Sequence, residues 1–528
     1  MSVMFERFDF QIVEVKQLLD LLPQVAILAV LLGLAVVASR PRKYGEFDIV
    51  GDKNDLRAAL RKGTELVSCL RCITVTSGGR LSRTLGPPVI VPYLRLRHTH
   101  LPFPSSSSPL AMIDEIKSLP DSKVSTAPEL FKRAGGHYSK LGTNALAAIK
   151  ALRIDLRRRT TTIPQLTEEA RYAFDDALGT FREWTPLAVF PRINRAVAIV
   201  SGRVFLGQRL SRQEEWISLS SEWAVHVFGI MRAIQRYPSW LRPYVMPYLP
   251  ETRQVLAHRA KVKAFLAPTF QMHIEAKENK SSVEGEEESF VSWLMKYIAP
   301  RHTTIESLTR HHMSITWASI HTSTYALTQI LFDLAARPEY QDILREEIED
   351  VFPTSSTEEV TQADLAKLAK MDSFMKEAMR LNPLTIVAPL RMVTAEPLTL
   401  SSGQTLQPGD SFGFDSTSIN HSTELYSSPG PETFDGLRYY RMRQKAGEEQ
   451  KHQFGVTGVQ ETFGFGHGIH ACPGRHSATI EIKILLIHML TSYDFKLKDG
   501  HKRPSNGLDE IWWRWTPDPT AEVLIKSS

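Results

Sequence analysis

Cysteine is scarce in this chain, with three among 528 residues. So few cysteines over this length exclude a disulfide framework and favour a reducing compartment. Two of them form the pair Cys69-x-x-Cys72, a spacing that occurs in zinc and redox sites. The sequence has no second pair at zinc spacing and no strand–helix redox context, so we interpret this spacing as chance. Only Cys472 has a distinctive setting.

The chain also lacks a strong charge imbalance. Its net charge is +5, with 63 Lys and Arg against 58 Asp and Glu. This excess is too small to imply nucleic-acid binding, and no zinc-finger or RNA-binding signature occurs. No nicotinamide or flavin motif and no internal repeat occur either. Hydrophobic content of 42% and charged content of 23% are ordinary for a globular protein.

Long apolar runs are missing except for one, Leu21 to Ala38, which carries no charge. About 18 residues is the lower limit for a membrane-spanning helix. A basic cluster, residues 40–43, follows the run at once, and acidic residues predominate before it. The positive-inside rule then places the rest of the chain in the cytosol. A cleaved signal peptide is the alternative, but the preceding segment is long and acidic and no A-x-A site ends the run.

The residues around Cys472 form a loop of small residues just ahead of an apolar run, Ile480 to Leu490, that predicts a helix. Thiolate is the metal-binding form of cysteine, and a helix N-terminus favours negative charge. A lone thiolate presented in this way suits the axial ligand of a haem iron. The alternative is a buried structural cysteine in a glycine-rich turn. The loop reads Phe465-Gly-His-Gly-Ile-His-Ala-Cys-Pro-Gly474.

This loop closely resembles the haem-binding loop of the cytochrome P-450 monooxygenases. The resemblance implies heme b as cofactor, with Cys472 as the axial thiolate ligand of its iron. Similarity extends from about Asp55 to the C-terminus and is weakest from Gly63 to Ala111. The matching loop residues are Phe465, Gly468, His470, Cys472 and Gly474.

A charged pair with helical spacing precedes the loop. Glu377 and Arg380 are three residues apart, so they share one face of a helix. Alone, such a pair is usually a solvated surface pair of little value. Arg438 follows in a proline-containing stretch, and this order matches the order of motifs in the family. The resemblance implies that the three residues form one buried ion network that supports the fold and haem retention, not the chemistry.

A long apolar-periodic stretch from about Thr304 to Ala336 predicts a helix of nearly 50 Å. Ala318 and Thr322 lie on one face of it. By resemblance, Ala318 leaves space for dioxygen above the haem, and Thr322 hydrogen-bonds the oxygen or a proton-delivering water. The stretch departs from the family pattern, with Ser319 for the usual Gly and His321 for the usual acid. His321 either relays protons, since histidine titrates near neutrality, or only caps a polar pocket.

The two haem propionates need cationic or polar partners. By resemblance, His470 and Arg391 contact one propionate each. The apolar residues before Arg391 are then expected to line the substrate pocket, namely Ile386, Val387 and Leu390. The early haem contact of the family is not evident, and the basic run 157–159 lies in that region. This run is either a docking surface for a reductase or a solvated helix face.

We expect a mainly α fold with small β-sheets, the cytochrome P-450 fold with its long central helix over the haem. A single N-terminal transmembrane helix precedes it. The predicted divisions are a lumenal segment at 1–20, an anchor at 21–38, a linker at 39–54 and the catalytic domain at 55–528. Residues 93–111 carry a serine run without clear periodicity. We interpret them as an insertion, either a retained intron in the gene sequence or a lineage-specific loop, with a short helix beginning at Met112.

The predicted function is a monooxygenase in the endoplasmic reticulum membrane that inserts one atom of O2 into a hydrophobic small molecule. Because the chain has no site for the electron donor, the resemblance implies NADPH-cytochrome P-450 reductase as partner, with cytochrome b5 as a second candidate. Segments 200–205 and 237–243 resemble fungal members that oxidise terpenoids, so a terpenoid or another secondary-metabolite intermediate is the expected substrate.

Two other functions stay open at this point. One is a haem-thiolate isomerase or dehydratase that needs no reductase. Such members often lose the oxygen-handling Thr, and Thr322 is present. The other is a non-catalytic membrane haem-binding protein, which would not need Ala318 and Thr322 arranged around an oxygen site.

Overall fold

The computed structural model describes residues 72–75, 109–141, 146–156, 162–281, 283, 285–353, 360–401, 403, 405–457, 464–509 and 514–528. The predicted anchor 21–38, both of its flanks and most of the predicted insertion lie outside these residues. Within them, no helix has the length and apolar character that crossing a membrane requires. All of them belong to one of two compact units of the chain, the unit of Gly51–Leu94 and Thr99–Ser528.

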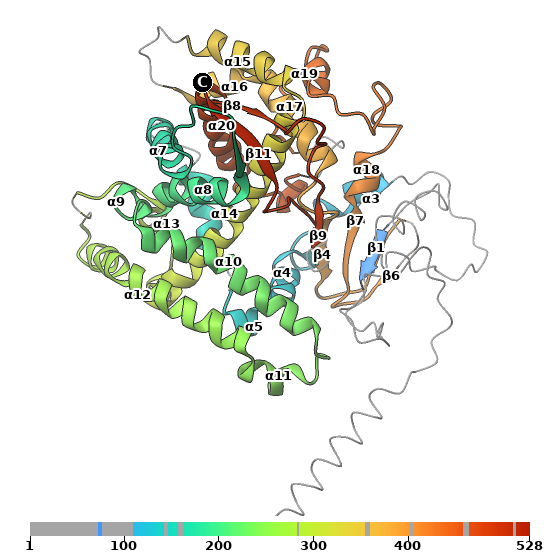
Figure 1. The fold of residues 1–528 in the computed structure, drawn as a ribbon. Helices are drawn as coiled ribbons and strands as arrows, with labels where there is room; N and C mark the ends of the chain where they lie inside the picture. The colour runs from blue at the N-terminus through green and yellow to red at the C-terminus, as the bar shows by residue number, and fades with distance from the viewer. Residues whose placement is uncertain are drawn as a thin grey trace, which may run out of the picture. The chain divides into compact units, whose positions relative to one another are not determined.

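Helices make up most of the described chain, as the hydrophobic periodicity predicts (Figure 1). The helices are α3 Pro109–Ile116, α4 Ala127–Arg133, α5 Gly136–Ser139, α6 Leu146–Lys150, α7 Thr162–Ala177, α8 Val189–Leu206, α9 Gln208–Ser211, α10 Glu214–Gln235, α11 Arg242–Val245, α12 Pro250–Glu278, α13 Phe290–Tyr297, α14 Ile305–Ala335, α15 Glu339–Val351, α16 Gln362–Lys367, α17 Ala369–Leu381, α18 Ser416–Asn420, α19 Arg438–Arg443 and α20 Arg475–Ser492. A π-helical turn, Ala151–Leu156, extends α6, and a 3₁₀ turn, Gly468–His470, lies in the cysteine loop.

The strands form small antiparallel sheets. The largest has the order β1-β7-β4-β2, and a three-stranded sheet has the order β3-β11-β8. Two further pairs are β5 with β6 and β9 with β10. The strands are β1 Cys72–Val75, β2 Val124–Ser125, β3 Thr185–Ala188, β4 Val387–Val393, β5 Leu398–Thr399, β6 Thr405–Leu406, β7 Ser411–Asp415, β8 Tyr493–Lys496, β9 Gly507–Asp509, β10 Arg514–Thr516 and β11 Glu522–Ser527.

Helix α14 is the predicted long helix. The hydroxyl of Thr304 accepts a hydrogen bond from the Ser307 N–H at 3.2 Å, which satisfies one of the unpaired donors at the helix start. The helix ends at Ala335, shortly before Pro338, because proline disfavours helical conformation in the residue before it. Its 31 residues span about 46 Å. It packs against α8, α10, α12, α17 and α20, so it positions side chains from the middle of the helical region (Figure 1).

One sequence expectation needs correction, and two long-range contacts have no counterpart in the sequence patterns. Helix α3 begins at Pro109, so the end of the predicted insertion is helical and not loop. The C-terminal strand β11 pairs antiparallel with β8 and also with β3, a strand more than 300 residues earlier. The Glu287 carboxylate, in an acidic loop, pairs with the buried Arg203 at 2.8 Å.

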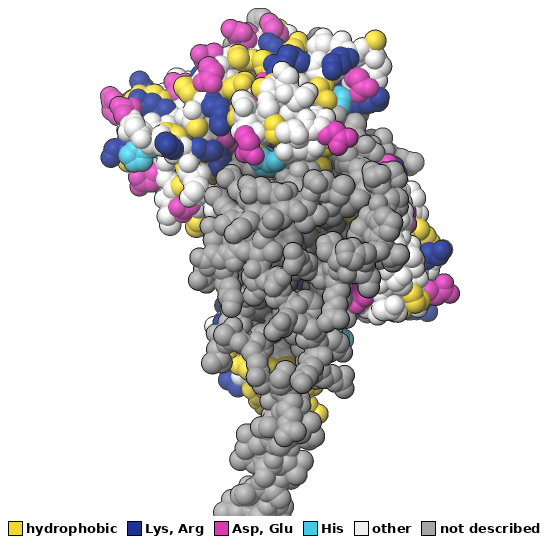
Figure 2. Space-filling view, turned by 90° about the vertical axis from the view of Figure 1, so that its right-hand side faces the viewer, with side chains coloured by type: hydrophobic (Ala, Val, Ile, Leu, Met, Phe, Trp, Pro, Cys, Tyr) yellow, Lys and Arg dark blue, Asp and Glu magenta, His cyan; other side chains and the backbone are white. Residues whose placement is uncertain are grey.

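Charge is spread over the described surface. On the face shown in Figure 2, acidic and basic side chains are interspersed, and hydrophobic side chains appear singly among them. The described part of this face therefore shows no single large patch of basic side chains.

Candidate functional site

The cysteine loop positions Cys472 at the entrance of α20. The Cys472 backbone N–H donates to the Phe465 carbonyl at 2.8 Å, which closes the loop, and α20 begins three residues later. Burial raises the pKa of the Cys472 thiol, while the backbone N–H groups of Gly474 and Arg475 act in the opposite direction. A metal ion bound to this sulfur would remove the proton, because a coordinating thiol is deprotonated. The site can therefore supply one thiolate ligand.

Two glycines of the loop, Gly468 and Gly474, differ in the space around them and in their backbone conformation. Gly468 adopts φ +66°, and a Cβ there would lie 2.0 Å from the Lys117 carbonyl oxygen, so a side chain would both strain the backbone and collide with it. A Cβ on Gly474 would meet no described atom within 4 Å. Gly474 therefore leaves room for a ligand to approach the loop, whereas Gly468 allows the loop to contact the backbone just after α3.

Two polar side chains near the loop, Arg391 and His470, each have a buried nitrogen without a hydrogen-bond partner among the described residues. Arg391, on β4, donates from Nη1 to Thr126 Oγ1 at 2.7 Å and to the Leu390 carbonyl at 2.8 Å. Its Nε, and Nε2 of His470, are buried without a hydrogen-bond partner among the described residues. Burial lowers the pKa of Arg391 to about 10, and burial followed by the charge of Arg391 lowers the pKa of His470. An anionic ligand would satisfy both groups.

The structure places a further cation at the loop that sequence reasoning missed. Arg153, in the π-helical turn after α6, lies with Nη2 3.4 Å from the Ile469 carbonyl oxygen. It lines a cavity of about 270 Å³ together with Arg475 and His476. The sequence had directed attention to the basic run 157–159, which lies outside the described residues. The signal that could have found Arg153 is its place on a helical segment ahead of that run.

On α14, Ala318 and Thr322 are exposed although most of the helix is buried. They are four residues apart and share one face, as expected. The Thr322 hydroxyl donates to the Ala318 carbonyl at 2.8 Å and lies 3.2 Å from the Ser319 carbonyl. The hydroxyl is thus held against the helix backbone, and its oxygen can accept a hydrogen bond from a ligand or a water on this face.

A buried hydroxyl–carboxyl chain reaches α14 from α20. The Ser319 and Ser201 hydroxyl oxygens lie 3.2 Å apart, and the Ser201 hydroxyl donates to the Glu481 carboxylate at 2.6 Å. Because Ser201 uses its one proton toward Glu481, Ser319 is the donor in the first contact. Burial raises the pKa of Glu481 to about 7, with the Ser201 hydrogen bond acting in the opposite direction. A carboxyl that holds and releases a proton near neutrality is therefore linked to the residue beside Ala318.

The surroundings of His321 bear on the two roles that the sequence left open for it. Its side chain is buried, and burial together with the charge of Arg514 lowers its pKa to about 4. The ring lies against Phe228 and Tyr325, at centroid distances of 6.2 and 6.3 Å. A neutral imidazole holds no proton to relay at neutral pH, which favours the other role, a polar residue that only caps a pocket. The sequence could not show this because burial decides it.

The structure brings Glu377, Arg380 and Arg438 together. Glu377 pairs with Arg380 Nε at 2.8 Å and with Arg438 Nε at 3.2 Å, and the Asp435 backbone N–H also donates to it at 3.0 Å. Glu377 and Arg380 are fully buried, and Arg438 is nearly so. Arg380 also donates to the backbone carbonyls of Asn420 and Pro431. The network thus ties α17 to the loop that leads to α19.

The arrangement fits a flat, dianionic group with a metal that takes one thiolate. Cys472 offers the thiolate, and Arg391 and His470 offer donors for carboxylates. Gly474 leaves an open approach. Phe465 is half-buried and packs edge-on against Phe454, with ring centroids 5.3 Å apart, so the loop is anchored in the core. Haem has this chemistry, with its iron and its two propionates.

Comparison with known proteins agrees with this geometry. The family model described as Cytochrome P450 matches residues 147–516. The chain is 35% identical over 450 residues to the cytochrome P450 monooxygenase ascG of Acremonium egyptiacum, covering 79% of this chain and 83% of that protein. It is 33% identical over 481 residues to the cytochrome P450 monooxygenase BOA4 of Botryotinia fuckeliana, covering 90% of each. It is 34% identical over 430 residues to the cytochrome P450 monooxygenase gliF of Aspergillus fumigatus, covering 79% of this chain and 83% of that protein.

Proposed function

This chain belongs to the cytochrome P450 family, and we propose that it is a membrane-anchored monooxygenase that oxidises a terpenoid or a similar apolar secondary-metabolite intermediate. Members of the family bind haem through a cysteine thiolate, and Cys472 is the residue in position to supply it. The observation that carries the proposal is the conjunction of the Cys472 loop with the donors of Arg391 and His470.

Bound through the thiolate, the haem supplies cleavage of the O–O bond and transfer of one oxygen atom. The overall reaction joins substrate R–H, O2, NADPH and a proton into R–OH, water and NADP⁺. Two electrons pass from NADPH, and the second oxygen atom leaves as water. The chain itself must hold the haem, admit an apolar substrate and deliver protons.

Several described residues are placed to deliver protons in the proposed reaction. Thr322 presents its hydroxyl on the exposed face of α14. Three residues earlier, Ser319 is linked through Ser201 to Glu481, whose pKa burial raises to about 7. A carboxyl with this pKa can lose a proton toward α14 and regain one, since the best catalytic pKa lies near the working pH. We assign Glu481 as the proton store and Ser201 and Ser319 as the relay.

The residues around the site support an apolar substrate. Ile386 and Val387 are buried and Leu390 is half-buried, just ahead of Arg391 on β4. Phe228 and Tyr325 lie against His321 of α14, and the guanidinium of Arg514 stacks on both rings, 4.5 and 4.8 Å from their centroids. Such aromatic walls favour a hydrophobic molecule. The two segments that resemble terpenoid-oxidising members narrow the class by analogy.

The reductase and the membrane anchor are parts of the proposal as well. The sequence contains no nicotinamide or flavin motif, so electrons must come from a second protein. Arg153 and Arg475 make the surface beside the cysteine loop basic, which suits an acidic partner such as NADPH-cytochrome P-450 reductase. The anchor proposal depends on the apolar run 21–38 and the basic residues after it, and it places the catalytic domain on the cytosolic face of the endoplasmic reticulum.

The test uses microsomes that contain this protein with its reductase, supplied with a panel of terpenoid intermediates. We expect a product one oxygen atom heavier than the substrate, formed only with NADPH and reductase, and labelled when ¹⁸O2 replaces O2. A product that forms without reductase would indicate isomerase or dehydratase chemistry and refute the monooxygenase assignment for that substrate. Oxidation of other apolar compounds but of no terpenoid in the panel would refute the substrate class alone.

A further inference from the structure

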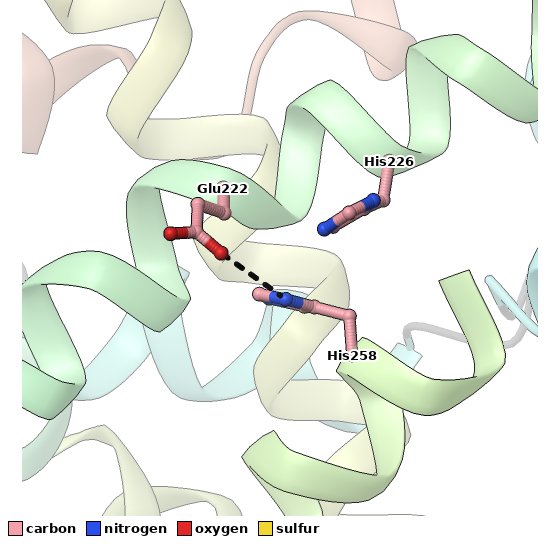
Figure 3. A group of neighbouring side chains, drawn as sticks. All are labelled: Glu222, His226 and His258. Carbon is pink, nitrogen blue, oxygen red and sulfur yellow. Dashed lines mark ion pairs between the residues drawn. The ribbon is translucent and has the colours of Figure 1, made fainter. Parts of the chain in front are cut away.

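A cluster of three metal-ligating side chains lies away from the cysteine loop, between α10 and α12. Glu222 and His226 are four residues apart on α10 and share one face, and His258 reaches them from α12 (Figure 3). One ligand atom from each of the three lies within 4.8 Å of the other two. The imidazole rings of His226 and His258 have centroids 4.6 Å apart. Nothing in the monooxygenase chemistry uses these residues.

The hydrogen bonding of His258 leaves a ligand atom facing the cluster. Its Nε2 lies 2.8 Å from the Leu219 carbonyl oxygen, and a carbonyl can only accept, so Nε2 carries the proton. The other nitrogen, Nδ1, faces the Glu222 carboxylate at 3.7 Å, which is the dashed contact in Figure 3. Burial lowers the pKa of both His226 and His258, which favours neutral rings. The Nδ1 lone pair and the Glu222 carboxylate therefore face the same point, where a cation could bind both.

Neighbouring groups hold the ligands in this orientation. His258 is buried and stacks on Trp223, with centroids 6.1 Å apart and an interplanar angle of 11°. The Ser218 hydroxyl donates to Oε1 of Glu222 at 2.8 Å, which leaves Oε2 directed at His258. Outer groups of this kind, a backbone carbonyl on the far nitrogen of a histidine and a hydroxyl on a carboxylate, are typical of protein metal sites.

We propose that Glu222, His226 and His258 bind a divalent transition metal ion, and that this ion is Zn²⁺. Two imidazoles and one carboxylate suit Zn²⁺, whereas Ca²⁺ and Mg²⁺ prefer oxygen ligands throughout. Tetrahedral zinc with bonds of about 2.0–2.1 Å places its ligand atoms about 3.4 Å apart, so side chains whose ligand atoms lie within 4.8 Å of one another must close by at most about 1.4 Å. Glu222 is exposed and His226 is half-buried, so both can rotate to do so. Water completes the coordination.

A bound ion would join two helices that are separated in sequence by the α11 region. Helix α10 also carries Phe228, which lies against His321 of α14. Zinc would thus stiffen the wall of helices beside the proposed substrate pocket. The exposed Lys261 lowers the pKa of both histidines through its charge, so it also opposes a cation here. Water screens this exposed charge, and its removal should strengthen binding.

The experiment measures zinc binding to the full-length, haem-loaded protein, purified in detergent without a polyhistidine tag and stripped of metal by a chelator. Equilibrium dialysis with elemental analysis gives the stoichiometry, and a competing fluorescent chelator gives the affinity. We expect one equivalent of zinc at this site and no comparable binding of Ca²⁺ or Mg²⁺. Hydrogen exchange should slow in α10 and α12 when zinc is added.

Variants assign the ion to this site. Glu222→Gln and His226→Gln, both at accessible positions, should each remove the bound equivalent, and Ser218→Ala should weaken it by about 10–100-fold, as for other outer groups. Lys261→Gln should bind more tightly. Glu215→Gln, an exposed carboxylate on the same helix, is the matched control and should bind as the unaltered protein does.

Two results would overturn the proposal. One is the absence of any bound zinc in the unaltered protein. The other is a bound equivalent that persists at full affinity in both Glu222→Gln and His226→Gln, which would place the ion elsewhere, for example at the Cys69–Cys72 pair. Neither result would refute the proposed monooxygenase function, because the experiment measures bound zinc in each variant and not oxidation of a substrate.

Discussion

Glu377→Gln is expected to lower the free energy of unfolding by much more than an isosteric change in an exposed ion pair. Glu377 is the only carboxylate that contacts Arg380 or Arg438 among the described residues, and it accepts through both oxygens. Glutamine keeps the shape but removes the charge, and its amide N–H₂ faces further donors. Two buried guanidinium groups then lack a counter-ion, which costs about 3–5 kcal/mol in the free energy of unfolding.

The structure favours the lower end of that range. Arg380 keeps its hydrogen bonds to the Asn420 and Pro431 carbonyls, at 2.6 and 2.7 Å, so part of its charge remains solvated by backbone dipoles. A matched control is Asp114→Asn. Asp114 pairs with Lys117 at the same i,i+3 spacing, 2.7 Å apart, but both side chains are about two-fifths exposed. An exposed pair of this kind contributes about 0.2–1 kcal/mol.

Urea unfolding followed by far-ultraviolet circular dichroism measures the loss, and the haem Soret band in the same samples measures haem retention. Haem binds only the folded state, so both transitions should shift to lower urea in Glu377→Gln, and hardly in Asp114→Asn. A Glu377→Gln protein with the same midpoint and slope as the unaltered protein would refute the argument. It would show that backbone carbonyls alone neutralise the two arginines.

The remaining predictions concern chemistry, pH and the membrane. Cys472→Ser should abolish the thiolate-type absorbance of the ferrous–CO form, and an unchanged spectrum would remove Cys472 as the ligand. Thr322→Ala should keep haem but divert NADPH electrons to hydrogen peroxide, because positioned proton transfer contributes about 10²–10⁴-fold to the rate. An unchanged yield of product per NADPH in Thr322→Ala would contradict this role of Thr322. His321→Ala should leave the pH profile of the activity near neutrality unchanged. The pKa of Glu481 rises from 4.5 to about 7 on folding, so between these pH values the unfolded chain binds fewer protons and the free energy of unfolding falls as pH rises. Glu481→Gln should remove this fall in urea midpoints measured from pH 4.5 to 7. The same pH dependence in Glu481→Gln and in the unaltered protein would contradict the assigned pKa. Deletion of residues 1–40 should move the protein from the membrane to the soluble fraction, which carbonate extraction tests, and continued resistance would argue against a single anchor.

Local sequence patterns predicted the elements whose determinants are local. Helix α14 follows from its apolar period, from Thr304 at its start and from Pro338 after its end. Helix α17 and the Glu377–Arg380 pair follow from i,i+3 spacing. The order of motifs along the chain then supplied Arg438, which spacing alone could not, because 61 residues separate it from Glu377.

Contacts between residues far apart had no comparable signal. Strand β3 is short and contains a proline, and it is a strand only because β11 pairs with it. Ser201 and Glu481 are 280 residues apart, and each is unremarkable in its own segment. The pKa values of Glu481 and His321 depend on burial, which arises from the packing of several helices and is not encoded in the neighbouring residues.

The two departures of α14 from the family pattern make sense when they are taken together. His321 is where the family has an acid, and burial keeps this histidine neutral among aromatic rings, so it has no proton to give at neutral pH. Ser319 is where the family has a glycine, and its hydroxyl reaches Ser201 and through it a carboxyl with a pKa of about 7. A glycine there could not make this contact. Ser319 thus supplies a hydroxyl on α14 that is linked to a carboxyl, and under the proposed function this link, rather than His321, brings protons to the helix segment that carries Thr322.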